Sequence, residues 1–222
     1  MEPLDSVSRG YFGNKPLIIG TTTEETRPFI FEGFRKAVSP LKYAALLSAL
    51  NPTHALDILS LYPASTDADE RDQLQVPATD FVFTCCTRNY TRNAGDRNGG
   101  KVWYYIYAHA FSFVEAWANL TFCRNHVCHG SELPFVFQSA GLYNYTMTAD
   151  ENVLSDSMIG YWSNFAKSGD PNSGQTVSVN WPEYSKENNW THMRFRTPAN
   201  ELENNYRQMY CDFWDRIGYA WQ

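Results

Sequence analysis

The sequence predicts an α/β fold in which a few central strands are flanked by several helices. Two short apolar runs, at 16–20 and 102–107, have the composition of buried parallel strands. Apolar residues recur at helical spacing in three stretches, at 40–61, 152–168 and 201–219. Two or three strands make a small sheet for 222 residues, because a doubly wound domain normally has more. The chain therefore has the pattern of part of such a domain.

The first predicted strand ends at Gly20 and leads into a polar loop at 21–25. The stretch 40–61 is predicted to form two helices, because Pro52 cannot lie in a helix interior without breaking it. The side chains expected to face the core from these helices are Leu41, Leu46, Leu47, Leu50, Leu56, Ile58 and Leu59.

A further helix is predicted from about residue 79 to residue 91, followed by a polar, glycine-rich turn at 93–100. The helix at 152–168 is amphipathic, and it should end at Gly169 because Pro171 prevents continuation. Its apolar stripe consists of Leu154, Met158, Tyr161, Trp162 and Phe165.

The last predicted helix, at 201–219, has the strongest amphipathic pattern in the chain. Its apolar face consists of Leu202, Tyr206, Met209, Tyr210, Phe213, Trp214 and Ile217. Cys211 falls off this face, so the predicted core does not require a cysteine there.

The composition is that of a globular protein, with 43% hydrophobic and 19% charged residues. The net charge is −6, and no cluster of Lys and Arg would attract nucleic acid or anionic lipid. No apolar run approaches the ~20 residues of a membrane span.

Several features indicate a secreted protein. The chain has five cysteines, which favours an oxidising compartment. The first five residues lack the basic start and apolar stretch of a signal peptide, so such a peptide is expected upstream. Four Asn-x-Thr sequons predict glycosylation at Asn89, Asn119, Asn144 and Asn189.

One histidine has a conspicuous position. His129 follows the apolar strand at 102–107 and precedes the helix at 152–168. A histidine in a loop beyond a buried strand is where an α/β-hydrolase keeps its general base.

Five segments resemble the type-B carboxylesterase and cholinesterase family of the α/β-hydrolase superfamily, in the same order along the chain. They are Lys15 to Gly20 followed by Glu24-Glu25, Tyr105-Ile106-Tyr107, His129 to Phe137, Tyr161 to Asn172, and Trp181 to Tyr184. The family's domain is much longer than this chain. The resemblance therefore implies that residues 1–222 are the C-terminal part of a single α/β-hydrolase domain.

The resemblance also implies catalytic roles, since triads of this superfamily run in the order Ser, acid, His. By resemblance, His129 is the general base and Glu25 is the acid that accepts its Nδ1 proton. Glu24 is adjacent and is the alternative acid. Thr26 stands where the family usually has glycine.

The chain has no Gly-x-Ser-x-Gly nucleophile elbow. The nearest string, 137–141, lacks the first glycine and lies after His129, so Ser139 is interpreted as a loop residue. The glycine-rich oxyanion segment is also missing, because Gly99-Gly100 is isolated in a turn. Because triad members act as a unit, we expect negligible esterase activity from this chain alone.

Cys85 and Cys211 resemble the family's long-loop disulfide, which would contribute on the order of 4–5 kcal/mol. Cys123 and Cys128 would close a small loop directly before His129, worth roughly 2 kcal/mol. A metal site made of these two cysteines with His126 and His129 is the alternative for that pair. Cys86 is left as a free thiol or as a competitor of Cys85.

The resemblance implies an intact enzyme that hydrolyses a small carboxylic ester through an acyl-serine intermediate, without cofactor or metal. Two alternatives remain open. One is a secreted, non-catalytic, cholinesterase-like adhesion or interaction module. The other is a half-protein whose missing N-terminal half comes from a partner chain. A homodimer through the late helices, including 201–219, is also possible on the family pattern.

Overall fold

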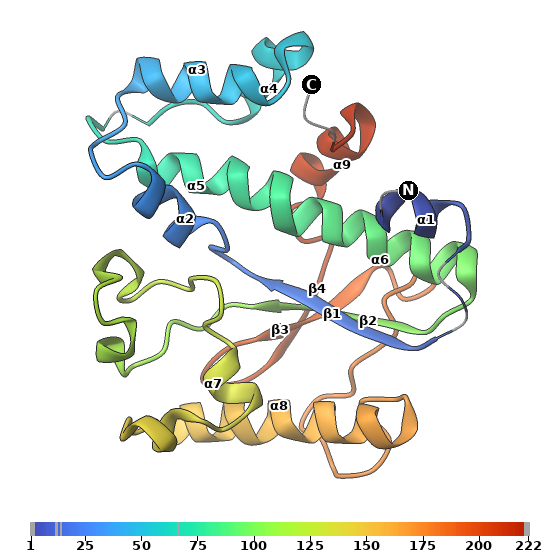
Figure 1. Ribbon diagram of the computed structural model, residues 1–222. Coiled ribbons are helices and arrows are strands. Elements are labelled where there is room, and N and C mark those ends of the chain that lie inside the picture. The colour runs from blue at the N-terminus through green and yellow to red at the C-terminus, as the bar shows by residue number, and fades with distance from the viewer. Residues whose placement is uncertain (1–2, 12, 14, 66, 220–222) are drawn as a thin grey trace.

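The computed structural model describes residues 3–11, 13, 15–65 and 67–219, and its centre is a four-stranded sheet between two helical layers (Figure 1). The strands are β1 (Leu17–Thr22), β2 (Val102–Tyr107), β3 (Thr191–Phe195) and β4 (Glu201–Asn204). The α-helices are α1 (Pro3–Ser8), α2 (Arg27–Gly33), α3 (Pro40–Leu50), α4 (Ala55–Leu61), α5 (Arg71–Thr79), α6 (Cys85–Asn98), α7 (Leu133–Val136), α8 (Ala149–Ser168) and α9 (Gln208–Ile217).

The sheet has the order β1-β2-β3-β4. The first three strands are parallel, and β4 runs antiparallel to β3. In the β1–β2 ladder Leu17 lies opposite Val102 and Thr22 lies opposite Tyr107, so both strands end at the same edge of the sheet. This mixed sheet with flanking helices confirms the predicted α/β class.

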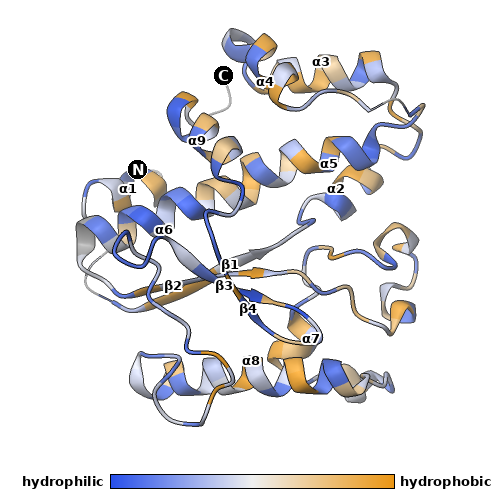
Figure 2. Ribbon diagram, turned by 180° about the vertical axis from the view of Figure 1, so that it is seen from behind, coloured by the Kyte–Doolittle hydropathy of each residue, from blue (hydrophilic) through white to orange (hydrophobic). Residues whose placement is uncertain are grey.

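Helices cover both faces of the sheet (Figure 1). On one face α7 and α8 pack against the sheet, where Trp103 and Phe195 meet Met158 and Tyr161 of α8. On the other face lie α5, α6 and α9, with α3 and α4 beyond α5. Strand β2 is almost entirely buried, whereas the outermost strand β4 is hydrophilic (Figure 2).

The helix predicted at 79–91 is longer than expected. Helices α5 and α6 are joined by a π-helical turn at Asp80–Thr84, so helical backbone continues from Arg71 to Asn98. Pro77 lies inside α5, and the wider π turn follows it, which is one way that a helix accommodates a disrupted hydrogen-bond ladder. The predicted turn at 93–100 is wrong, because the helix ends only where Gly99 adopts a left-handed conformation with φ of 62°.

The helix predicted at 201–219 is wrong in its first third. Glu201–Asn204 pairs with β3 as strand β4, and the left-handed backbone at Asn205 and Arg207 separates it from α9. Cys211 is fully buried in a core cluster with Trp214, contrary to the expectation that it lies off the apolar face.

The predictions for α3, α4 and α8 are largely confirmed. Proline divides α3 from α4, and α8 ends at Gly169 in a left-handed conformation. Leu47 and Ile58 are buried as predicted, but Leu41 and Leu56 are 84% and 83% exposed. These two helices form an outer layer that packs on one side only, so part of their apolar residues face outward. No helix in the described part of the chain has the length and apolar composition needed to cross a membrane.

Candidate active site

The loops that follow β1 and β2 meet because the two strands are parallel neighbours. The backbone N–H of Thr23 donates to the carbonyl of Tyr107, which extends the ladder past the ends of the strands. Farther along, the N–H of Glu24 donates to the carbonyl of Val127, and Glu24 forms an isolated parallel bridge with Cys128. The loop that carries Glu25 is thereby bound to the loop that carries His129.

Glu25 and His129 form a close pair. His129 Nδ1 lies 2.5 Å from Glu25 Oε2, and Glu25 Oε1 accepts the backbone N–H of Thr22 at 2.6 Å. The Glu25 side chain is 6% exposed and the His129 side chain is 52% exposed. Among the described residues, Nδ1 has a hydrogen-bond partner and Nε2 has none. The buried Glu25 carboxylate therefore orients the ring and leaves its Nε2 edge open.

Two aromatic rings flank this imidazole. Phe29 of α2 and Phe83 of the π-helical turn each lie 5.6 Å from the His129 ring centroid, and they stack on each other. Such contacts restrict the tilt of the ring. The ring plane is therefore set by packing as well as by Glu25.

A second carboxyl group, that of Glu132, lies near the pair and was not identified from the sequence. Burial raises the pKa of Glu132, and the neighbouring Glu25 carboxylate also raises it, while His129 acts in the opposite direction. Burial thus makes the Glu132 carboxyl harder to ionise than the same group in water. The sequence did contain an indication of this proximity, because Glu132 lies only three residues after His129.

The alternative acid, Glu24, binds other partners. Its Oε1 lies 2.9 Å from His126 Nδ1, and its Oε2 accepts the N–H of Val127 at 2.8 Å. Glu24 also pairs with Arg27. The structure therefore pairs His129 with Glu25 and His126 with Glu24.

Thr26 is accommodated at the position where the family usually has glycine. Its backbone has φ of −88° and ψ of −3°, a conformation that any residue adopts. Its side chain is buried and donates to the carbonyl of Gln75, and its N–H donates to Thr79 Oγ1. Thr26 therefore anchors the acid loop to α5.

Both expected disulfides are present. Cys85 of α6 is bonded to Cys211 of α9, and Cys123 is bonded to Cys128 directly before His129. Cys86 is a free thiol. Because both sulfurs of the second pair are in a disulfide, they do not serve as metal ligands. In the part of the chain that the structure describes, no group of three or more ligating side chains is arranged to hold a metal ion.

Two serines could be mistaken for a nucleophile. Ser139 lines an open pocket of about 270 Å³ together with Phe113, Pro134 and Tyr145, and among the described contacts it does not bond to His129. Ser112 Oγ donates to Glu151 Oε2 at 2.6 Å, and His109 Nε2 lies 2.9 Å from the other oxygen. The Ser112 hydroxyl donates its proton to the Glu151 carboxylate and not to the His109 imidazole. His109 therefore does not act as a base for Ser112 in this arrangement.

The Glu151 carboxylate instead stabilises the start of α8. It accepts the N–H of Thr148, whose hydroxyl accepts the N–H of Glu151 in return, which is a capping box. Burial opposes its ionisation, but the hydrogen bonds from Ser112, Thr148 and His109 outweigh that effect and lower the pKa of Glu151 to about 2.

The predicted glycosylation residues lie in two kinds of environment. Asn119, Asn144 and Asn189 are exposed and lie in loops or turns. Asn89 lies in the middle of α6, and its Nδ2 donates to Asp215 Oδ1 at 2.9 Å. The first three amides are accessible, whereas the amide of Asn89 is engaged.

Comparison with known proteins shows which family the sequence matches. The family model described as "Carboxylesterase family" matches residues 1–214. The cAMP-regulated D2 protein of Dictyostelium discoideum is 33% identical over 192 residues, which cover 86% of this chain and 35% of that protein. The Crystal protein of the same organism is 25% identical over 98% of this chain and 40% of its own length.

Two animal enzymes match shorter stretches. Acetylcholinesterase 1 of Caenorhabditis elegans is 30% identical over 61% of this chain and 22% of its own length. Bile salt-activated lipase of Bos taurus is 34% identical over 39% of this chain and 15% of its own length. The chain thus spans at most 40% of the length of these relatives. With a match over nearly its whole length to the family model, this chain belongs to the carboxylesterase family.

Proposed function

We propose that this chain is the C-terminal part of a serine carboxylesterase, in which Glu25 and His129 are the acid and the general base of the catalytic triad. The observation that carries the proposal is the 2.5 Å separation of His129 Nδ1 and Glu25 Oε2. The same geometry leaves the Nε2 edge of a half-exposed ring free to accept the proton of a serine.

In this mechanism the serine hydroxyl attacks the carbonyl carbon of the ester as His129 Nε2 takes its proton. Glu25 holds the imidazole in the required tautomer and stabilises the imidazolium that forms. His129 then protonates the leaving alcohol, and a water molecule activated by the same imidazole releases the acid from the acyl-serine. This sequence of steps needs no cofactor.

The serine has to come from polypeptide outside residues 1–222, which contain no Gly-x-Ser-x-Gly string. The free edge of β1 supports this idea. Among the described residues β1 pairs with β2 only, and residues 17–20 are half-buried, whereas β2 is almost fully buried. We place the strand that leads to the nucleophile on this side of β1, either in the same polypeptide or in a partner chain.

The proposed protein is a secreted glycoprotein. Its two disulfides support an oxidising compartment. Its substrate class is a small carboxylic ester, and the chain alone is expected to be inactive because triad members act as a unit.

The test is complementation. The 222-residue chain is co-expressed with the N-terminal part of a carboxylesterase-family protein that carries the elbow, and hydrolysis of p-nitrophenyl butyrate is measured. We expect activity only when both parts are present, and its loss in Glu25→Gln and His129→Gln. His54→Gln, at a histidine of the distant outer helical layer, is the matched control and should retain activity.

Serine-dependent hydrolysis by the chain alone would contradict the proposal. If the two parts associate but give no hydrolysis, the non-catalytic interaction module becomes the better interpretation.

A further inference from the structure

A second histidine–glutamate pair lies beside the first. Glu24 precedes Glu25, and His126 lies three residues before His129. Glu24 Oε1 lies 2.9 Å from His126 Nδ1, and Glu24 Oε2 accepts the N–H of Val127 at 2.8 Å. One carboxylate of the acid loop therefore holds two consecutive residues of the histidine loop with both of its oxygens.

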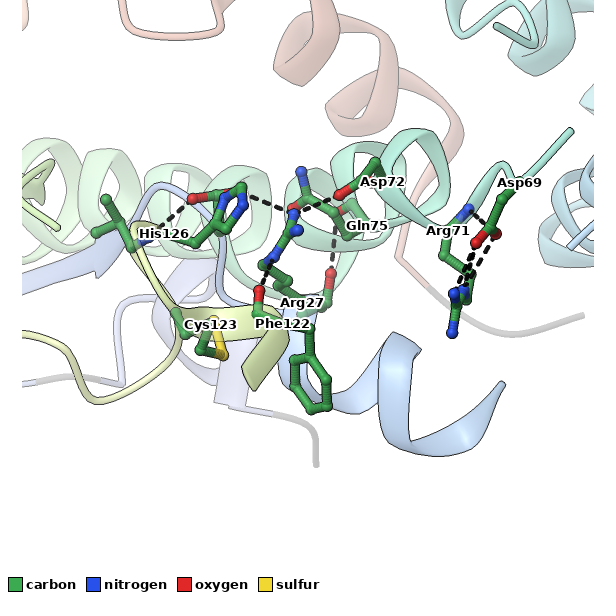
Figure 3. Close-up of polar contacts among 12 residues, drawn as sticks. Arg27, Asp69, Arg71, Asp72, Gln75, Phe122, Cys123 and His126 are labelled. Atoms are coloured by element: carbon green, nitrogen blue, oxygen red, sulfur yellow. Dashed lines mark hydrogen bonds and ion pairs between the residues drawn. A yellow bond between two sulfur atoms is a disulfide. The ribbon is translucent and has the colours of Figure 1, made fainter. Parts of the chain in front are cut away.

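Arg27 holds the other end of the same loop. Its guanidinium is buried, and Nε donates to the carbonyl of Phe122 at 2.6 Å (Figure 3). Its Nη1 lies 3.3 Å from Glu24 Oε1 and 2.6 Å from a carboxylate oxygen of Asp72 on α5. Phe122 directly precedes the small ring closed by the Cys123–Cys128 disulfide, and Val127 lies within that ring. The ring is therefore bonded at Phe122, just before it, and at His126 and Val127, near its end. We call Glu24, Arg27 and His126 the loop clasp.

The loop clasp takes no part in the proposed proton transfer. The His126 ring is bound to Glu24 and not to Glu25. Glu24 and His126 also lie outside the apolar core clusters. Glu24 binds His126 and Val127 of the histidine loop, and it also pairs with Arg27. His126 and Val127 lie just before His129 in the chain, so their position affects the distance from His129 to Glu25.

We propose that Glu24 and His126 are positioning residues that hold 126–128 against the acid loop and so keep His129 Nδ1 within hydrogen-bond distance of Glu25. This inference rests on the proposed function, since it gives the clasp a role only if the Glu25–His129 pair is the catalytic one. A catalytic group has to be held within about 0.5 Å of its productive position by its surroundings. The disulfide ring restrains the shape of the loop but not its distance from Glu25. The backbone bond from the N–H of Glu24 to the carbonyl of Val127 also links the two loops, and it does not depend on the side chains changed below, so a change in exchange reports on the side chains.

The test is the exchange with solvent of the His129 Nδ1 proton, measured by NMR on the 222-residue chain. A proton in a short hydrogen bond to a carboxylate gives a far-downfield resonance, which is assigned by its absence in His129→Gln. We expect Glu24→Gln to speed its exchange at least tenfold, because the amide cannot accept from both His126 and Val127. His126→Ala should speed it by a smaller factor, since the Val127 contact remains.

The matched control is Asp57→Asn. It alters the exposed pair of Asp57 on α4 and His54 just before α4, which lie 3.3 Å apart, and it should leave the His129 resonance unchanged. Urea unfolding of each variant separates a local effect from a general loss of stability. If Glu24→Gln does not fold, His126→Ala decides the question.

The possible outcomes are distinct. An unchanged His129 exchange rate in the folded variants overturns the positioning role and leaves the proposed function standing. Absence of the downfield resonance in the unmodified chain overturns the Glu25–His129 pairing, and with it both proposals.

Discussion

Gly20 lies directly opposite Tyr105 in the β1–β2 ladder, and there is no room for a side chain on it. A Cβ at this position would overlap the ring and the carbonyl oxygen of Tyr105. The absence of a side chain lets the tyrosine ring lie across the neighbouring strand, just before the acid loop begins.

Gly20→Ala is therefore expected to destabilise the protein by about 3 kcal/mol, because the overlap involves backbone that cannot move away. The measurement is the free energy of unfolding in urea. Gly33→Ala is the matched control, since a Cβ at Gly33 meets nothing within 4 Å. Equal stabilities of the two variants would refute the close approach.

The Cys85–Cys211 disulfide closes a loop of 126 residues between α6 and α9. Replacing both cysteines by serine should lower the free energy of unfolding by about 5 kcal/mol in the chain-entropy model. Cys86→Ser should change it little, because the Cys86 thiol donates to the carbonyl oxygens of Val82 and Phe83 in the preceding π-helical turn, and a serine hydroxyl can do the same. Peptide mapping without reduction gives an independent check, and a peptide that links Cys86 to Cys211 would contradict the structure.

His192 of β3 is fully buried between the rings of Tyr104 and Tyr206, and burial lowers its pKa to about 4. The folded state therefore prefers the neutral imidazole. Its contribution to stability is present above the unfolded pKa of about 6.5 and is lost as the pH falls towards 4.

Between pH 7 and pH 5 this one group should cost the protein about 2 kcal/mol of unfolding free energy. His192→Phe removes the titration, so the variant should lose about 2 kcal/mol less than the unmodified chain over that interval. Urea unfolding at the two pH values measures the difference. The same pH dependence in both proteins would show that His192 is not buried in its neutral form.

Glycan occupancy should differ among the four sequons. We expect glycans on Asn119, Asn144 and Asn189 when the chain passes through a eukaryotic secretory route. We expect none on Asn89 of α6, whose amide donates to Asp215 of α9. Mass spectrometry of tryptic peptides before and after deglycosylation gives the occupancy at each site. Full occupancy at Asn89 would mean that α6 is not formed when the sugar is added.

The sequence predicted the α/β class and strands β1 and β2 from local apolar patterns, and the resemblance implied the two disulfides. Strand β3, in the middle of the sheet, was not predicted. The resemblance also pointed to Glu25 and His129, whose side chains are in contact, while their catalytic roles stay a prediction. Strand β4 was missed because Leu202 extends the apolar periodicity of the following helix. Only the pairing of residues 201–204 with β3 makes this segment a strand.

The loop clasp was missed for a different reason. Glu24, Arg27 and His126 are each ordinary surface residues by type, and no spacing rule joins residues about 100 positions apart. One signal was available. The sequence has a Glu-Glu pair in one loop and two histidines in the other, which is enough for two pairs instead of one.

The two edges of the sheet differ in what they accept. Strand β4 has charged side chains, with Glu203 paired to Arg194 and Glu201 to Arg196, and such residues discourage a further strand. Strand β1 has an apolar edge with no charge on it. The sheet can therefore grow in one direction only. If two copies of this chain met through that edge, they would cap each other, so the pair would be closed and would not propagate into a fibre.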